Sequence, residues 1–72
     1  MTEPFNIAVV GAGGFAHFAT TEFVKIPTVK LFAIYDENLA NAARIKTIDD
    51  TARIYNSMQE LCNEPAIHLI YI

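Results

Sequence analysis

The sequence predicts an α/β fold in which a doubly wound parallel sheet carries helices on both faces, as in Rossmann-like domains. Three observations support this prediction. Apolar runs typical of buried strands alternate with runs of helical spacing along the chain. A G-x-G-x-x-A turn follows the first apolar run, and an acidic residue ends the second. Short crossovers of this kind are right-handed, which gives the order β-α-β-α-β-α-β and the strand order 3-2-1-4.

The first half of the chain is predicted to form two strands joined by a helix. Residues 5–10 are apolar without strict alternation, as expected for a parallel strand covered on both faces. Residues 13–25 change to helical spacing, and Pro27 ends that helix. Residues 29–35 (VKLFAIY) form the second buried strand.

The second half repeats this alternation with shorter elements. A helix is expected over residues 39–46, and a short strand over residues 52–55. Residues 57–60 (SMQE) fit a capping box that opens a third helix. Residues 67–72 (IHLIYI) read as a central strand with no polar tail behind it, so the chain is expected to be a truncated form of the complete fold.

The glycine-rich turn after the first strand predicts a site for a pyrophosphate at a helix N-terminus. Gly11 allows a tight exit from the strand, Gly13 lets the backbone approach phosphate, and Ala16 keeps the helix close to the sheet. The N–H groups of Gly14 and Phe15 would point at phosphate oxygens. A turn made of small residues for packing alone is the alternative. The predicted phosphate-binding residues are Gly11, Ala12, Gly13, Gly14, Phe15 and Ala16.

Asp36 ends the second strand, where a carboxylate can accept both hydroxyls of an adenosine ribose. A 2′-phosphate would meet Asp36 and Glu37 together, and the nearest cations are Arg44 and Lys46, further along the chain. The predicted cofactor is therefore NAD, with NADP disfavoured. Alternatively, Asp36 only caps the following helix.

Composition limits the partners and the compartment. The chain is 53% apolar and 18% charged, which excludes disorder caused by low hydrophobicity. Its net charge of −3 and the lack of any Lys/Arg cluster argue against nucleic acid. No apolar run approaches the roughly 20 residues that span a bilayer, so no membrane partner is expected. A single cysteine, Cys62, and no signal peptide favour a cytoplasmic location.

The remaining chemistry-bearing side chains predict no catalytic residue and no metal site. His17 is expected on the exposed face of the first helix, and a solvated histidine is the simpler interpretation. His68, inside an apolar strand, is expected to be a hydrogen-bonded interior residue or a contact to a neighbour. Cys62 is expected on the packed side of its helix as a buried thiol.

These segments together resemble the N-terminal domain of the glucose-fructose oxidoreductase/inositol dehydrogenase (Gfo/Idh/MocA) family. The resemblance rests on the order and spacing of NIAVVGAGGFA, LFAIYDEN, an alanine-rich second helix, SMQELC and AIHLIYI. It implies a dinucleotide fingerprint at Gly11, Gly13 and Ala16, and a ribose-binding acid at Asp36. His68 stands where the family usually has an acidic residue.

The resemblance implies a parent enzyme that transfers hydride between a nicotinamide and a sugar-like or polyol alcohol or carbonyl. In that family an Ala-Thr-Pro-like turn, a Glu-Lys-Pro segment with the catalytic lysine and a substrate domain follow this strand. Residues 1–72 are therefore expected to be an incomplete N-terminal dinucleotide-binding domain, catalytically inactive alone, with the substrate domain absent and the terminal strand prone to self-association.

Two alternatives remain open: a free-standing module that binds a nucleotide or a partner through its sheet edge, and part of a flavin or S-adenosylmethionine enzyme.

Overall fold

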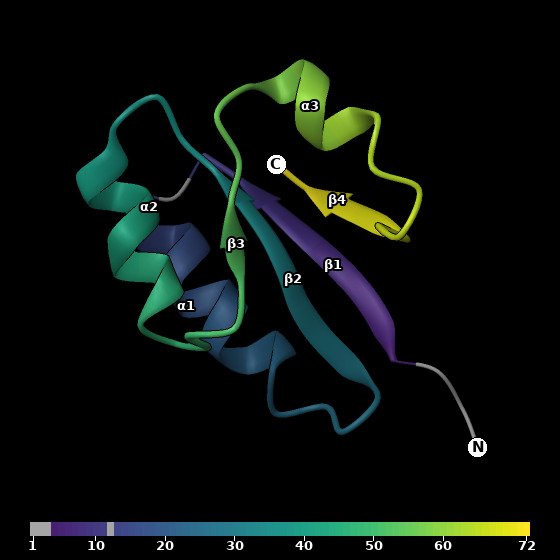
Figure 1. Cartoon of the computed structure of the whole chain (residues 1–72). Helices are drawn as coiled ribbons and strands as arrows, with labels where there is room; N and C mark the ends of the chain where they lie inside the picture. Colours follow the sequence, from purple (N-terminus) through teal and green to yellow (C-terminus); the bar gives the residue numbers. More distant parts are fainter. Residues whose placement is uncertain (1–3, 12) are drawn as a thin grey trace.

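The strands of this protein form one parallel four-stranded sheet with the order β3-β2-β1-β4, as predicted. The computed structural model describes residues 4–11 and 13–72. Helices and strands alternate along the chain, and β4 forms one edge of the sheet (Figure 1). The elements are β1 (Phe5–Val10), α1 (Gly14–Phe23), β2 (Val29–Tyr35), α2 (Leu39–Lys46), β3 (Arg53–Ile54), α3 (Met58–Cys62) and β4 (Leu69–Tyr71).

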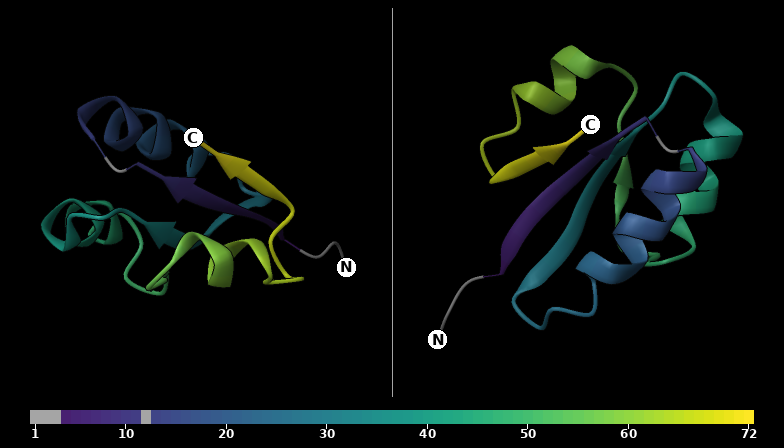
Figure 2. Two further views of the ribbon diagram at one scale, coloured as in Figure 1. Left: turned by 90° about the horizontal axis from the view of Figure 1, so that it is seen from above. Right: turned by 180° about the vertical axis from the view of Figure 1, so that it is seen from behind.

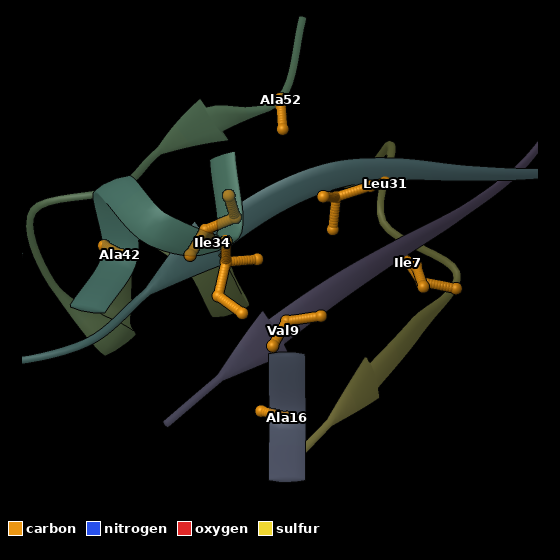
Figure 3. Packing of buried hydrophobic residues seen from close by; sticks show 8 residues of the cluster. Ile7, Val9, Ala16, Leu31, Ile34, Ala42 and Ala52 are labelled. Atoms are coloured by element: carbon orange, nitrogen blue, oxygen red, sulfur yellow. The ribbon is translucent and has the colours of Figure 1, made fainter. Parts of the chain in front are cut away.

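Helices cover both faces of the sheet, which confirms the doubly wound architecture. On one face, α1 and α2 pack beside each other, and the right-hand view of Figure 2 shows α1 in front with α2 partly behind it. On the other face, Leu61 of α3 packs against Ala8 and Ala33. Figure 3 shows most of the larger core, which is formed by Ile7, Val9, Ala16, Leu31, Ile34, Ala42, Ile45 and Ala52.

The side chains of β2 divide between the larger core and a smaller core on the other face because β2 contains a bulge. The smaller core is formed by Ala8, Ala33, Tyr55 and Leu61. Ile7 of β1 pairs with Leu31, but the next residue, Ala8, pairs with Ala33, so that Phe32 is the extra residue. Because of this shift, the adjacent Phe32 and Ala33 both pack with the smaller core. Their neighbours Leu31 and Ile34 pack with the larger one.

Some elements are shorter than the sequence pattern predicts. The predicted helix over residues 13–25 ends at Phe23, and the N–H of Ile26 donates to the carbonyl of Phe23 in a tighter turn. Ile26 precedes Pro27, whose ring disfavours helical geometry at the residue before it. The third strand has two residues in place of the four predicted, and the last strand begins at Leu69, not at residue 67.

No helix in the described parts of the chain, residues 4–11 and 13–72, is long and apolar enough to cross a membrane.

Candidate dinucleotide-binding site

The turn between β1 and α1 begins with a residue that must be glycine. Gly11 has φ +79°, in the left-handed region that side chains with a Cβ disfavour. Its N–H donates to the carbonyl oxygen of Tyr35 at 3.0 Å, which continues the β1–β2 ladder by one residue. The N–H of Gly13 then donates back to the carbonyl oxygen of Gly11 at 2.9 Å. The chain thereby reverses sharply at the carboxyl edge of the sheet.

Gly13 and Gly14 are glycines for a different reason. Gly13 has φ −78° and ψ −173°, which any residue can adopt. A Cβ built on either glycine would meet no atom of the described residues within 4 Å. Neither the backbone conformation of Gly13 nor packing within the chain therefore requires a glycine there. The open space beside both residues fits a ligand that approaches the backbone closely.

Backbone N–H groups at the N-terminus of α1 lie beside this open space. The first intrahelical bond runs from the N–H of His17 to the carbonyl oxygen of Gly13, at 3.0 Å. The N–H groups of Gly14, Phe15 and Ala16 precede it, and within the described residues none of them has an acceptor in the helix. Within the described residues, no side chain caps this end and the first turn holds no acid. The helix dipole is therefore left to attract an anion.

Ala16 and Phe15 contribute to this site in different ways. The Ala16 side chain is buried in the larger core against β1, and the hydroxyl of Thr20 donates to its carbonyl oxygen at 2.7 Å. This small residue lets the helix lie close to the sheet. The Phe15 side chain is 73% exposed, so the contribution expected of Phe15 comes from its backbone N–H.

Asp36 lies next to the glycine turn because Val10 and Tyr35, the last residues of β1 and β2, are paired. One carboxylate oxygen, Oδ1, accepts a hydrogen bond from the N–H of Asn38 at 2.7 Å. Asn38 is the N-cap of α2, and its own side chain accepts from the N–H of Ala40 at 2.9 Å. The alternative that Asp36 caps α2 is therefore wrong, and Asp36 instead orders the turn before the cap.

A hollow of about 390 Å³ joins the turn to this carboxylate. It combines apolar walls with acidic groups at the carboxyl edge of the sheet. Its lining residues are Val10, Gly11, Tyr35, Asp36, Glu37 and Met58. The sequence places Met58 only in the segment that opens the third helix. Its place directly after the Ser57 cap, at the edge of the sheet where the parallel strands end, was the signal that could have indicated the hollow.

Polar contacts hold the residues just before and just after the helix that carries Met58. The Ser57 hydroxyl accepts from the N–H of Glu60 at 3.1 Å, which confirms the Ser57 half of the predicted capping box. The Tyr55 hydroxyl donates to Glu64 at 3.1 Å, and the Arg53 guanidinium lies 4.8 Å from the centre of the Tyr55 ring. Burial, and then the Glu64 carboxylate, raise the pKa of Tyr55, so its hydroxyl stays a donor at neutral pH.

The side chains of the nearest cations, Arg44 and Lys46, bond to groups outside the hollow. Arg44 and Lys46 lie in the last turn of α2, whereas Asp36 precedes its first turn. The guanidinium of Arg44 donates to the side chain of Asn41 at 3.4 Å, and the Lys46 ammonium donates to the carbonyl oxygens of Asp50 and Ala52. The acidic side chains of Asp36 and Glu37 therefore dominate the electrostatics of the hollow.

The remaining candidate side chains lie away from this hollow. Cys62 is exposed, so the expected buried thiol is wrong: α3 has five residues and buries only Leu61 fully. His17 is half-buried and not fully exposed as expected. His68 is hydrogen-bonded, as one of its two interpretations predicted, but it is exposed and not interior. Across the described residues, no group of three His, Cys, Asp or Glu side chains could hold a metal.

The predicted cofactor-binding residues gather at one edge of the sheet. Gly11, Gly13, Gly14, Phe15 and Ala16 form the turn and the start of α1, and Asp36 lies beside them. Ala12, also predicted, lies outside the described residues.

The chain belongs to the Gfo/Idh/MocA family. The model of this oxidoreductase family, described as an NAD-binding Rossmann fold, matches residues 5–72. The chain is thus an NAD-binding Rossmann domain of an oxidoreductase family, as the resemblance of the sequence implied. No curated protein sequence matches it significantly.

Two solved structures share this fold. One is GenD2 from gentamicin A biosynthesis in complex with NAD, with a TM-score of 0.83 and 21% identity over 97% of this chain. The other is a Desulfitobacterium hafniense protein assigned as an NADPH-dependent oxidoreductase, with a TM-score of 0.86 and 18% identity over 100% of this chain. The chain spans only 20% and 21% of the lengths of those two proteins.

Proposed function

We propose that the turn after β1, the N-terminus of α1 and Asp36 together hold NAD. The proposal rests mainly on one observation: an open space at uncapped helix donors adjoins a hollow that contains a carboxylate. The residues of the proposed site are Gly11, Ala12, Gly13, Gly14, Phe15, Ala16 and Asp36.

Each part of the dinucleotide has a chemically suitable counterpart at this edge of the sheet. The N–H groups of Gly14 and Phe15 suit pyrophosphate oxygens, and Asp36 suits the ribose hydroxyls. Met58 and Val10 supply apolar surface for the adenine ring in the hollow. When bound, the nicotinamide would supply hydride transfer at its C4.

The whole protein is proposed to oxidise or reduce a sugar-like or polyol alcohol or carbonyl. In this proposal residues 1–72 are an incomplete N-terminal dinucleotide-binding domain, inactive alone, and the catalytic and substrate-binding groups lie outside them. Membership of an oxidoreductase family and coverage of about a fifth of the two solved structures support this division. A cytoplasmic location is part of the same proposal, since the one cysteine suits a reducing compartment.

Replacing Asp36 with asparagine is expected to relax the preference for NAD over NADP. An amide oxygen can still accept from the N–H of Asn38, so the turn is kept while the charge is removed. Hydrogen bonds to a charged group are worth about 1.5–3 kcal/mol, so NAD should bind about ten- to a hundredfold more weakly. NADP should bind more tightly than before, because its 2′-phosphate meets less negative charge. Calorimetric titration with both cofactors measures the two affinities.

The matched control is Asp50→Asn, which makes the same change at an exposed loop residue outside the hollow. It should leave both affinities unchanged. Equal NAD and NADP affinities in the unaltered protein, or an unchanged ratio in Asp36→Asn, would contradict the assigned role of Asp36.

A second candidate function, self-association through β4, is favoured by a specific surface. β4 forms an edge of the sheet, so no strand of the described residues lies on one side of its backbone. Leu69, Ile70 and Ile72 there are 45%, 37% and 85% exposed. Apolar edge strands of this kind template pairing with another chain. The proposed occupant of this edge is β4 of a second copy.

The 72-residue chain is therefore expected to sediment with a mass that rises with concentration. Ile72→Lys adds a charge beside the edge and should shift the chain towards monomer. Leu39→Lys makes a comparable change at a 67% exposed residue of α2, a helix that packs with β2 and β3, and should not. A monomer at all concentrations, or the same shift in both variants, would exclude this interface.

A further inference from the structure

The start of β4 is joined to β1 by a hydrogen bond that only an unprotonated histidine can accept. The N–H of Asn6 donates to Nδ1 of the His68 ring at 2.9 Å, and the N–H of His68 donates to the carbonyl oxygen of Asn6 at 2.9 Å. The regular ladder begins one residue later, where Leu69 pairs with Ile7. A side-chain ring therefore takes the place of a backbone carbonyl at this rung.

The neighbouring groups orient the His68 ring for this bond. The Phe5 ring stacks on it, with the ring centres 5.3 Å apart and an angle of 21° between the planes. The side-chain amide of Asn6 donates to the carbonyl oxygen of Ala66 at 2.9 Å, which fixes the segment just before the histidine. With Nδ1 as the acceptor, the neutral ring must carry its proton on Nε2.

We propose that His68 is a pH-sensitive latch for the edge strand β4. A proton taken from solvent onto Nδ1 turns the acceptor into a donor, so that two N–H groups face each other. Histidine side chains make this change between about pH 5 and pH 8. Protonation would then break the Asn6–His68 bond and loosen the start of β4. This proposal does not depend on the binding of NAD.

Of the titratable groups near the Asn6–His68 hydrogen bond, only His68 is proposed to change its protonation state. Among the described residues that line the two hollows beside His68, the titratable ones are Glu64 and Cys62. The carboxylate of Glu64 already accepts from the Tyr55 hydroxyl and from the N–H of Ala66, each at 3.1 Å.

The loosening is expected to begin at the latch because the other end of β4 has a separate anchor. The Tyr71 ring packs edge-on against Phe23 of α1, with the ring centres 5.4 Å apart. That contact is between two aromatic rings and contains no histidine. Residues close to His68 should therefore respond to pH more strongly than those near Tyr71.

Amide hydrogen exchange measured by NMR from about pH 8 to about pH 5 tests the latch. The His17→Gln variant is used, since His17 is the only other histidine in the sequence. After correction for intrinsic exchange, the protection of the Asn6 amide should fall about tenfold as His68 gains its proton, because one hydrogen bond is lost. The Gly11 amide, which bonds to β2, should keep its protection.

The ring itself provides a second measurement that needs no change at His68. Long-range ¹H–¹⁵N correlation spectra above about pH 8 should show the Nε2–H tautomer.

The variant His68→Gln keeps a side-chain acceptor that does not titrate, and it should abolish the pH dependence of Asn6 protection. Two results would overturn the proposal. One is an Nδ1–H tautomer of His68. The other is protection of the Asn6 amide that is independent of pH in the His17→Gln variant, which keeps His68.

Discussion

Replacing Gly13 with valine is expected to abolish measurable NAD binding and to leave the fold intact. The φ and ψ of Gly13, −78° and −173°, lie in the extended region that valine favours. A Cβ there meets no described atom within 4 Å, so no clash within the chain opposes the change. The branched side chain would instead occupy the space proposed for the pyrophosphate.

The expected loss of affinity is at least about a hundredfold, which corresponds to roughly 2.7 kcal/mol. The free energy of unfolding should fall by no more than about 1 kcal/mol, because Gly13 is the N-cap of α1 and valine is a poorer cap than glycine. Ala43→Val, at an exposed position of α2, is the matched control and should bind NAD normally. Calorimetric titration and urea unfolding measure the two effects separately.

Two outcomes of this experiment would contradict the proposed site. If Gly13→Val binds NAD as tightly as the unaltered protein, the cofactor does not approach this backbone. If it loses binding and stability together, the glycine serves packing, which is the alternative that the sequence left open.

Replacing Leu31 with alanine is expected to cost about 2–5 kcal/mol of stability. Leu31 of β2 is fully buried in the larger core, beside Ile7 of β1 and Ala52 (Figure 3). A chain of this length is typically stable by only about 4–11 kcal/mol, so this cavity could remove half of the total. The midpoint of urea unfolding should fall steeply, and NAD binding should weaken only as far as the folded fraction falls.

Leu39→Ala provides the matched control for the core. The chemical change is the same, but the Leu39 side chain is 67% exposed at the start of α2. It should alter the free energy of unfolding by about 0.5 kcal/mol or less. Equal losses in the two variants would show that burial against the sheet does not decide the stability of this fold.

The sequence predicted the longer elements well because their patterns are strong. The bounds of β1, β2 and α2 agree with prediction, since each is a clear apolar or helical run with a turn signal at its end. The strand order also follows from short right-handed crossovers. The fold class therefore depends on features that are local in the sequence.

The errors occur where tertiary contacts decide the structure. No local signal marks Phe32 as an extra residue, because the bulge depends on pairing with β1. The apolar run of residues 67–72 predicts a longer strand, but the rung at His68 is completed by its side chain. Helical spacing predicted that Cys62 lies on the packed side of α3. In a helix of five residues, this spacing does not define reliably which side chains face the sheet.

The candidate site was predicted in outline from the glycine pattern and the spacing to Asp36. The sequence could not show that Asn38 and not Asp36 caps α2, since both residues are good caps. It also could not show that Met58 lines the same hollow as Gly11, because those two residues are distant in the sequence.

An NMR titration of the 72-residue chain with NAD tests the central claim most directly. If NAD binds at the glycine turn, the amide signals of Gly13, Gly14, Phe15 and Asp36 should shift together and saturate with one dissociation constant. The signal of Ile26, in the turn beyond the other end of α1, should remain in place. NAD that leaves the first four signals unchanged, or that shifts them no more than Ile26, would contradict the account.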